Sequence, residues 1–194
     1  IVLTLTHTYN DPAATFWHGI FQVVSIATTT GYTTTGFHWW PSFLPIMLIL
    51  MSAIGGCAGS TAGGMKIIRA ILIYKQGRRE IDQLIHPSAL IPIKLGGKPV
   101  PESVIDAVWG FFALYTLSYV ILALAMTATG VDLVTAFSAV TACLNNLGPG
   151  LGAVADNYAG ISASGKWILC VSMLLGRLEI FTLLVLLTPT FWRA

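Results

Sequence analysis

Charge is the property that this sequence has least of. Charged side chains make up 9% of its 194 residues, whereas 55% of the residues are hydrophobic; about a quarter of the residues of an ordinary soluble domain are charged. Residues 104–126 contain one acid and no base, and residues 167–191 contain only Arg177 and Glu179. At about 1.5 Å per residue, each run is long enough as a helix to cross a hydrocarbon layer about 30 Å thick. The sequence therefore predicts an all-α, polytopic membrane protein.

Motifs for disulfides, metal sites and enzyme chemistry are also missing. The three cysteines, Cys57, Cys143 and Cys170, stand singly without a CxxC pair, and the four histidines show no ligand spacing. Isolated cysteines in apolar surroundings usually behave as small buried hydrophobes. The eight carboxylates are scattered along the chain, so no cluster of acids, histidines and metal ligands marks an active site. We predict that the protein is not an enzyme.

The few basic residues are unevenly placed. Seven of the ten lie within residues 66–98, and the positive-inside rule places that connection in the cytoplasm. Arg193 predicts that the C-terminus lies on the same side. Trp39, Trp40 and Trp167 then fall near the opposite interface, where aromatic belts occur.

One unit occurs twice in the chain. In each copy a half-length apolar helix, at about residues 13–28 and 132–144, begins near an aspartate and ends at a polar loop. The glycines of the two loops, Gly31 and Gly148, are 148 − 31 = 117 residues apart. Each loop is followed by a long apolar segment. We therefore predict the order long helix, half helix, glycine loop and long helix, repeated once.

The repeat predicts the domain boundaries. Residues 1–80 form the first unit, 81–101 a cytoplasmic linker and 102–194 the second unit. In the first unit we expect a truncated outer helix, a half helix at 13–28, a polar glycine loop at 28–37 and a broken inner helix at 43–74. In the second unit we expect an outer helix at 103–128, a half helix at 132–144, a glycine loop at 145–150 and an inner helix at 165–192. The chain opens like the tail of a helix and without an initiator Met, so we expect it to be a fragment. Within the linker, alternation around Gly96-Gly97 predicts a small hairpin.

The stretch SIATTTGYTTTGF, residues 25–37, predicts an ion-binding loop. Backbone that leaves a helix within the membrane must be buried in protein or line a water-filled cavity. A half helix that ends in such a loop can present carbonyl oxygens to an axis, where they replace the hydration shell of a cation. Glycine allows the unusual backbone angles that this arrangement needs.

The segment 43–74 is too long to be one spanning helix, because it would measure about 48 Å. Its centre, GGCAGSTAGG, holds five glycines, and each interior glycine costs a helix up to about 1 kcal/mol relative to alanine. This favours a broken helix with a loop inside the membrane. Close packing through small residues is the alternative, since Gly55, Gly59 and Gly63 have the required spacing. A phosphate-binding loop is rejected, because Met65 stands where lysine should follow Gly64.

Arg177 lies about ten residues, or roughly 15 Å, into the second predicted inner helix. An Arg at such depth costs at least about 2.5 kcal/mol and should therefore face a cavity or a partner. Glu179 points to another side of the helix and is a poor partner. Two interpretations stay open: a structural Arg held by backbone carbonyls, and a fixed positive charge on a permeation path.

Thr30-Gly31-Tyr32 resembles the filter of potassium channels. The two unequal copies, TTTGYTTTGF and NNLGPGLG, occur together with GGCAGSTAGGMK and GRLEIFTLLVLLTPTFWR. This combination resembles two of the four non-identical repeats of the Trk/Ktr/HKT potassium transporter superfamily. The likeness covers essentially the whole chain and is strongest to the third and fourth repeats, the C-terminal half, of the bacterial TrkH-type members. It implies potassium uptake across the bacterial inner membrane through a channel-like pore.

The resemblance also implies site residues. Ion-coordinating carbonyls would come from Thr28, Thr29, Thr30 and Gly31 in the first loop, and from Asn145, Asn146, Leu147 and Gly148 in the second. Leu147-Gly148-Pro149 departs from the usual channel pattern. An intramembrane loop and a pore-facing Arg would gate the pore through Gly55, Gly56, Gly59, Gly63, Gly64, Lys66 and Arg177.

The implied ligand is the potassium ion, without an organic cofactor. The implied partners are membrane lipid, the N-terminal half of the same pore, a second copy in a homodimer and a cytoplasmic nucleotide-binding (TrkA-like) regulatory subunit on the basic face; no nucleic acid is expected. Another potassium channel or a sodium/potassium transporter with the same pore architecture stays open as an alternative. A membrane-embedded enzyme or scaffold is the remaining alternative class. The coupling of uptake to protons or sodium (symport) also stays open.

Overall fold

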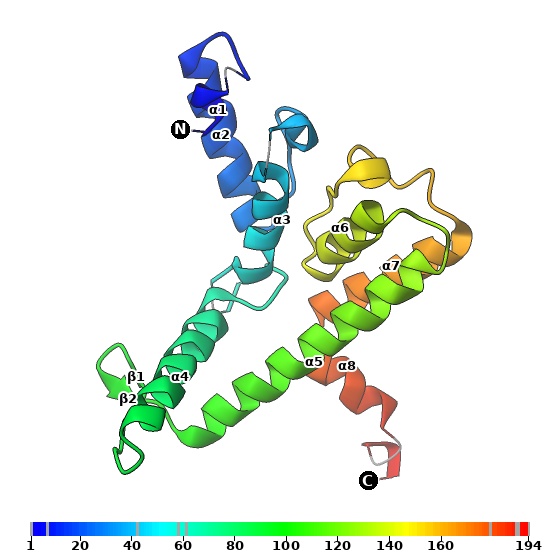
Figure 1. The fold of residues 1–194 in the computed structure, drawn as a ribbon. Coiled ribbons are helices and arrows are strands. Elements are labelled where there is room, and N and C mark those ends of the chain that lie inside the picture. Colours follow the sequence, from blue (N-terminus) through cyan, green and yellow to red (C-terminus); the bar gives the residue numbers. More distant parts are fainter. Residues whose placement is uncertain are drawn as a thin grey trace.

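The computed structural model describes residues 2–6, 8–41, 43–57, 59–60, 62–178, 180–188 and 191–193. Over these residues the fold is mostly helical (Figure 1). The α-helices are α1 Val2–Leu5, α2 Pro12–Ala27, α3 Leu44–Ile54, α4 Ile67–Ile85, α5 Glu102–Thr127, α6 Leu133–Leu144, α7 Ala163–Arg177 and α8 Ile180–Leu187. Short 3-10 turns cover Phe37–Trp39, Gly152–Val154 and Phe191–Arg193, and two strands cover Lys94–Leu95 (β1) and Lys98–Pro99 (β2).

Helices α2 and α6 are the two half-length helices, and both begin at an aspartate. The side chain of Asp11 accepts a hydrogen bond from the N–H of Ala13 at 3.0 Å. The side chain of Asp132 accepts one from the N–H of Thr135, also at 3.0 Å. An acid at this position satisfies an N–H that the helix leaves unpaired and interacts favourably with the helix dipole. With 16 and 12 residues, both helices are shorter than the roughly 20 residues that span a bilayer.

Helix α5 is the one helix among the described residues that is both long and apolar enough to cross a membrane. It runs from the β1–β2 end of the molecule to the end where α6 and α7 lie (Figure 1). Helix α6 packs against α3, α5 and α7. The core between α5, α6 and α7 includes the fully buried Met126, Ala136, Val140 and Leu144.

The inner helix of the first unit is interrupted at its glycine-rich stretch. Helix α3 ends at Ile54 and α4 begins at Ile67, and none of the described residues between them is helical. We call residues 55–66 the glycine segment. Helix α4 continues to Ile85, well past the predicted end at residue 74, because KQGRREIDQLI consists mostly of good helix formers. The predicted linker, residues 81–101, therefore begins inside α4, and the non-helical connection begins only after Ile85.

The second inner helix is also interrupted, and the prediction of one continuous helix over residues 165–192 is wrong. Helix α7 ends at Arg177 and α8 begins at Ile180. Next to this end Gly176 lies directly against the end of α6: a Cβ atom at Gly176 would be 1.8 Å from the carbonyl oxygen of Leu144. The prediction about Glu179 lies outside the described residues.

The predicted hairpin at Gly96-Gly97 is confirmed. Strands β1 and β2 pair antiparallel, with Lys94 opposite Pro99 and Leu95 opposite Lys98. The two glycines between them have φ angles of 57° and 82°. Two-residue hairpin turns of this kind need positive φ at both positions, which glycine adopts without strain.

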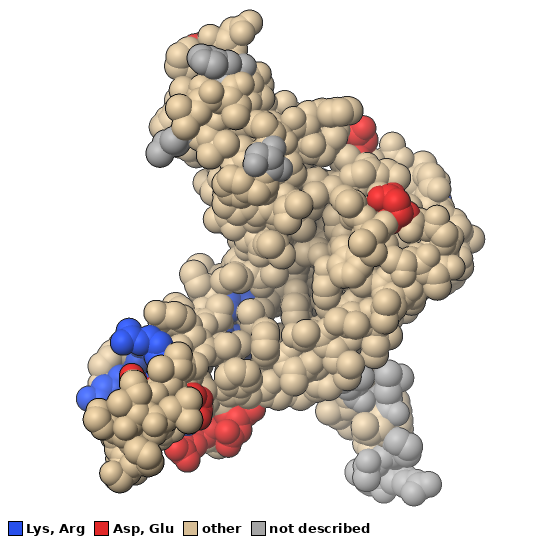
Figure 2. Space-filling model, viewed as in Figure 1, with Lys and Arg blue, Asp and Glu red and all other residues tan. Residues whose placement is uncertain are grey.

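Charged side chains gather at one end of the molecule. On the face shown in Figure 2, most Lys and Arg side chains lie over the end of α4 and the hairpin, and the opposite end shows acids but no bases. Local contacts hold this basic end together: Arg79 pairs with Glu102 at 3.5 Å, and Lys75 donates to the carbonyl oxygen of Lys94 at 2.6 Å. The separation suits a protein with one cytoplasmic face.

Candidate functional site

The loops that follow α2 and α6 have the same backbone conformation. Their first residues, Thr28 and Asn145, both have φ −87° and ψ 0°. Positive φ angles then recur at matching positions: Thr29 (55°) with Asn146 (53°), and Gly31 (79°) with Gly148 (104°).

Each loop is folded back onto its half helix. The N–H of Thr30 donates to the carbonyl oxygen of Ser25, and the N–H of Leu147 donates to that of Ala142, both at 2.8 Å. These bonds close the helix ends, as a left-handed residue after a helix does. A backbone N–H cannot coordinate a cation, so the carbonyl oxygens are the backbone groups through which the loops could hold one.

The two loops touch each other at Gly31. A Cβ atom at Gly31 would lie 1.9 Å from the carbonyl oxygen of Leu147, so no side chain fits between the loops. The leucine is 3% exposed and packs in a core cluster with Ile26, Phe37 and Leu48 of the first unit. The structure therefore brings the two predicted filter loops together across the repeat.

Local side-chain bonds support the first loop. The Thr28 hydroxyl donates to the carbonyl oxygen of Val24 at 2.7 Å and lies 2.8 Å from the Thr30 hydroxyl. Ser25 donates to the carbonyl oxygen of Tyr32 at 2.7 Å, and the side chain of Gln22 donates to that of Thr35 at 2.8 Å. All of these partners belong to α2 or the loop itself.

One predicted coordinating group of the second loop already has a protein partner. The hydroxyl of Tyr158 donates to the carbonyl oxygen of Gly148 at 2.6 Å. This leaves that oxygen one lone pair for a further ligand. The sequence analysis did not single out Tyr158, and its only signal is an aromatic residue in the polar loop after the repeat glycine.

The glycine segment lies against the ends of both half helices. A Cβ atom at Gly55 would be 1.9 Å from the carbonyl oxygen of Ala27, and one at Gly63 would be 2.0 Å from that of Asn145. At Gly59, by contrast, a Cβ atom would meet nothing within 4 Å. The predicted alternative, packing of small residues along one helix, requires a helix that the described part of this segment lacks.

The remaining predicted gating residues lie at other points of the segment. A Cβ atom at Gly56 would be 2.6 Å from the Cβ of Ala62, within the segment, and one at Gly64 would be 2.9 Å from the carbonyl oxygen of Ala53 at the end of α3. Lys66 directly precedes α4.

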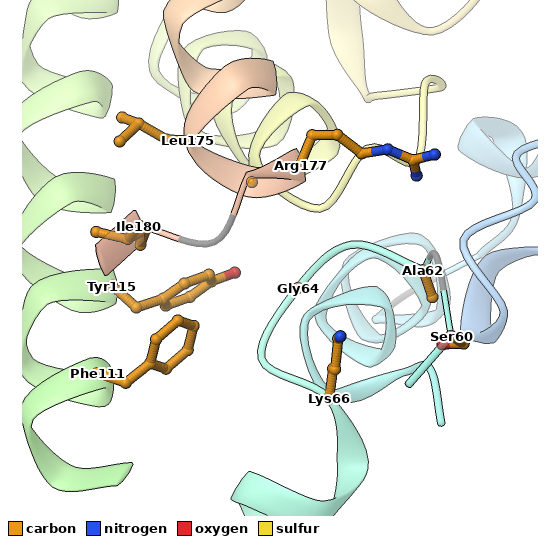
Figure 3. Close-up of a pocket in the computed structure, with 10 residues that line it drawn as sticks. Ser60, Ala62, Gly64, Lys66, Phe111, Tyr115, Leu175, Arg177 and Ile180 are labelled. Carbon is orange, nitrogen blue, oxygen red and sulfur yellow. The ribbon is translucent and has the colours of Figure 1, made fainter. Parts of the chain in front are cut away.

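Lys66, Gly64 and Arg177 line one cavity of about 170 Å³ between the glycine segment, α5 and the end of α7. Figure 3 shows Arg177 extending from the end of α7 above the segment, while the Lys66 amine points up into the cavity and the Tyr115 hydroxyl points toward the segment from α5. Arg177 is the last residue of α7, and a cation is favoured at the carboxyl end of a helix. The two predicted cationic gating residues, Lys66 and Arg177, therefore line the same cavity.

Two half-length helices that end in matching glycine loops, each followed by a broken helix, define a duplicated half-helix and loop fold. Comparison with known proteins shows the family of the chain. The chain belongs to the TrkH family, described as "Cation transport protein", whose pattern matches residues 7–193.

Several relatives show how close the similarity is. The chain is 57% identical over 194 residues to the Trk system potassium uptake protein TrkH of Vibrio parahaemolyticus, and 54% identical over 193 residues to that of Escherichia coli K12. Each of these matches covers 100% of this chain and 40% of the relative. The crystal structure of the potassium transporter TrkH from Vibrio parahaemolyticus superimposes with a TM-score of 0.92, over 99% of this chain and 41% of that one. The relatives are named as transport proteins, in line with the prediction of a protein that is not an enzyme.

Proposed function

We propose that this chain supplies two adjoining quarters of a potassium-conducting pore, and that the full-length protein takes up potassium across the inner membrane. The observation that carries the proposal is the matched pair of loops, which share their backbone angles and meet where Gly31 lies against Leu147. The relatives named as potassium uptake proteins support the choice of ion.

In this proposal the loops replace the water around a dehydrating potassium ion. Carbonyl oxygens of Thr28 to Gly31 and of Asn145 to Gly148 supply the coordination, while the N–H groups of Thr28 to Gly31 and of Asn145 to Leu147 are bonded back to α2 and α6. The two loops of this chain form half of the ring around the ion. The other half comes from the part of the full-length protein that corresponds to the uncovered part of the relatives.

The glycine segment and the two cations beside it form the gate of this proposal. The segment packs directly against the carbonyl oxygens of Ala27 and Asn145, and Arg177 and Lys66 line the cavity beside it. Fixed positive charge in a pore of low dielectric repels a cation far more strongly than in water. Displacing the segment and the guanidinium then opens the path.

The proposed lipid and regulatory partners follow from the surfaces, and the proposed homodimer follows from the resemblance to the family. The apolar faces take lipid, a second copy completes a homodimer, and the basic end over α4 and the hairpin receives a nucleotide-binding regulatory subunit. The C-terminus lies on the cytoplasmic side with this basic end.

The test is growth rescue of a potassium-uptake-deficient bacterium by the full-length protein, followed by ion flux in liposomes. We expect growth at low potassium and a flux in which sodium competes poorly. Folded protein that passes sodium and potassium equally would contradict a potassium filter, and folded protein without any cation flux would contradict the whole proposal.

A further inference from the structure

The side chain of Asn145 is buried at the junction of three elements. The hydroxyl of Tyr115, on α5, donates to its Oδ1 at 2.6 Å, and its Nδ2 donates to the hydroxyl of Ser52, on α3, at 2.9 Å. Ser52 in turn donates to the carbonyl oxygen of Ile49 at 2.6 Å. Asn145 and Ser52 are both 0% exposed. Breaking one bond of such a network leaves a buried polar group without a partner.

The same asparagine also touches the glycine segment. A Cβ atom at Gly63 would lie 2.0 Å from the Asn145 carbonyl oxygen, and one at Gly64 would lie 3.2 Å from its Oδ1. Ser52 lies in the last turn of α3, just before the segment begins. The backbone of Asn145 therefore contacts the segment. Its side chain is hydrogen-bonded to α3, the helix that leads into the segment.

Asn145 is at the same time the first residue of the second loop. Its N–H closes α6 on the carbonyl oxygen of Thr141 at 3.0 Å, and its φ and ψ set the direction of the residues that follow. A displacement of the end of α3 has to move Asn145 or break its bond to Ser52, and a displacement of the segment changes the close packing of Gly63 and Gly64 against Asn145. Within the part of the chain that the structure describes, Thr28, its counterpart in the first loop, bonds only inside its own unit.

We infer that Asn145 is a positioning residue that couples the glycine segment to the second filter loop, with Tyr115 and Ser52 holding its amide in place. Asn145 thereby sets the direction of the loop carbonyls. This inference rests on the proposed function, and it adds a specific role for Tyr115 and Ser52, which lie outside the two loops.

Tyr115→Phe is the test variant, because it removes one hydroxyl and keeps the ring. Tyr119→Phe is the matched control: Tyr119 lies one turn further along α5 and its hydroxyl accepts from Thr141 at 3.2 Å, without a bond to Asn145. Full-length protein is compared in liposomes for potassium-over-sodium preference and for basal flux, each per folded protein. We expect Tyr115→Phe to lower the preference about fivefold, the effect of one lost net hydrogen bond, and Tyr119→Phe to change it less than about twofold.

A double variant tests whether the two bonds act through one residue. Ser52→Ala removes the other partner of the Asn145 amide, and we expect a similar loss of preference. Tyr115→Phe combined with Ser52→Ala should then cost much less than the two effects multiplied, because residues of one network are not additive. Independent effects would overturn the assignment to Asn145.

A structural role gives a different result. If Tyr115→Phe lowers the melting temperature but leaves ion preference and basal flux equal to those of Tyr119→Phe, the inference is overturned while the proposed function stands. Wild-type protein without potassium flux would overturn both. A loss of preference in Tyr115→Phe at unchanged melting temperature supports the coupling.

Discussion

The two loops of this molecule have nearly the same backbone and very different support. The first is held by hydroxyl groups of its own threonines and of Ser25 and by the amide of Gln22 on α2, and Thr28 is exposed. The second is anchored by Asn145, whose amide is fully buried between α3 and α5. A duplicated backbone geometry can therefore be maintained by local bonds in one copy and by tertiary bonds in the other.

The comparison extends to the residues with positive φ. Asn146 has φ 53° and Thr29 has φ 55°. Asparagine tolerates this region, whereas a β-branched residue is rarely found there and is strained. The hydroxyl contact between Thr28 and Thr30, at 2.8 Å, spans this threonine. The first loop thus combines the more strained backbone with the lighter support, and we expect it to be the more sensitive of the two.

Substitution of the loop glycines should produce the largest effect. Gly31→Ser places a Cβ atom against the Leu147 carbonyl oxygen and forces a side chain into φ 79°, which costs about 1–2 kcal/mol before any clash. We expect a loss of potassium-over-sodium preference of at least about tenfold. Gly148→Ser is also strained, at φ 104°, but should cost less because a Cβ atom there meets nothing within 4 Å. Ion-competed flux in liposomes measures both.

Thr34→Ala is the control for this prediction. Its hydroxyl lies 3.1 Å from a ring nitrogen of His18, away from the contact between the loops. Equal and small changes for Gly31→Ser and Thr34→Ala would show that the filter lies elsewhere.

Removal of residues 55–64 should give the next largest effect, a several-fold rise in basal potassium flux. The segment packs against the carbonyl oxygens at the end of α2 and at Asn145, so its loss uncovers the space below both loops. Ion preference should change less than in Gly31→Ser, because Tyr115 and Ser52 still bind the Asn145 amide. Unchanged basal flux in folded protein would favour a packing role for the segment.

Replacement of Arg177 should raise flux by a smaller factor. Arg177→Ala removes one of the cationic side chains that line the cavity, while Lys66 remains there. We expect a rise of a few-fold in flux per folded protein, and a smaller rise for Arg177→Lys, which keeps the charge but loses the planar fork. If Arg177 is only structural, flux and melting temperature should fall together in Arg177→Ala.

The sequence predicted those features that depend on local signals. An aspartate followed by an apolar run predicts the start of each half helix, and the loop glycine predicts its end. The helical class and the hairpin turn at Gly96-Gly97 follow from the same kind of pattern. The roles of the loops and of the gate stay predictions.

The contacts that distinguish the two loops could not be predicted. Asn145 and Ser52 are 93 residues apart, and Asn145 and Tyr115 are 30 apart, so no local period links them. Tyr115 stands in an apolar helix, where its hydroxyl is the only hint of a buried partner. The end of α7 at Arg177 was missed because Gly176 is the only weak helix former beside it, and the nearby carbonyl of Leu144 comes from another helix.

Substitution of the aspartates that cap the two half helices should give the smallest effect, and the effect should be nearly equal at the two positions. Asp11→Ala and Asp132→Ala each remove a side chain that accepts an N–H of the first turn at 3.0 Å, so each should lower the melting temperature at pH 7 by about 2 °C. Hydrogen bonds from Thr135 lower the pKa of Asp132 below its ordinary value. Its contribution is therefore fully present above the unfolded value of about 3.9 and is lost as the pH falls through the lowered pKa. Melting curves of wild type and Asp132→Ala should converge in that acidic range. A change in ion preference at neutral pH in either variant would show that the cap acts on the loop. A much larger loss of melting temperature for one aspartate than for the other would show that the two half helices are not equivalent.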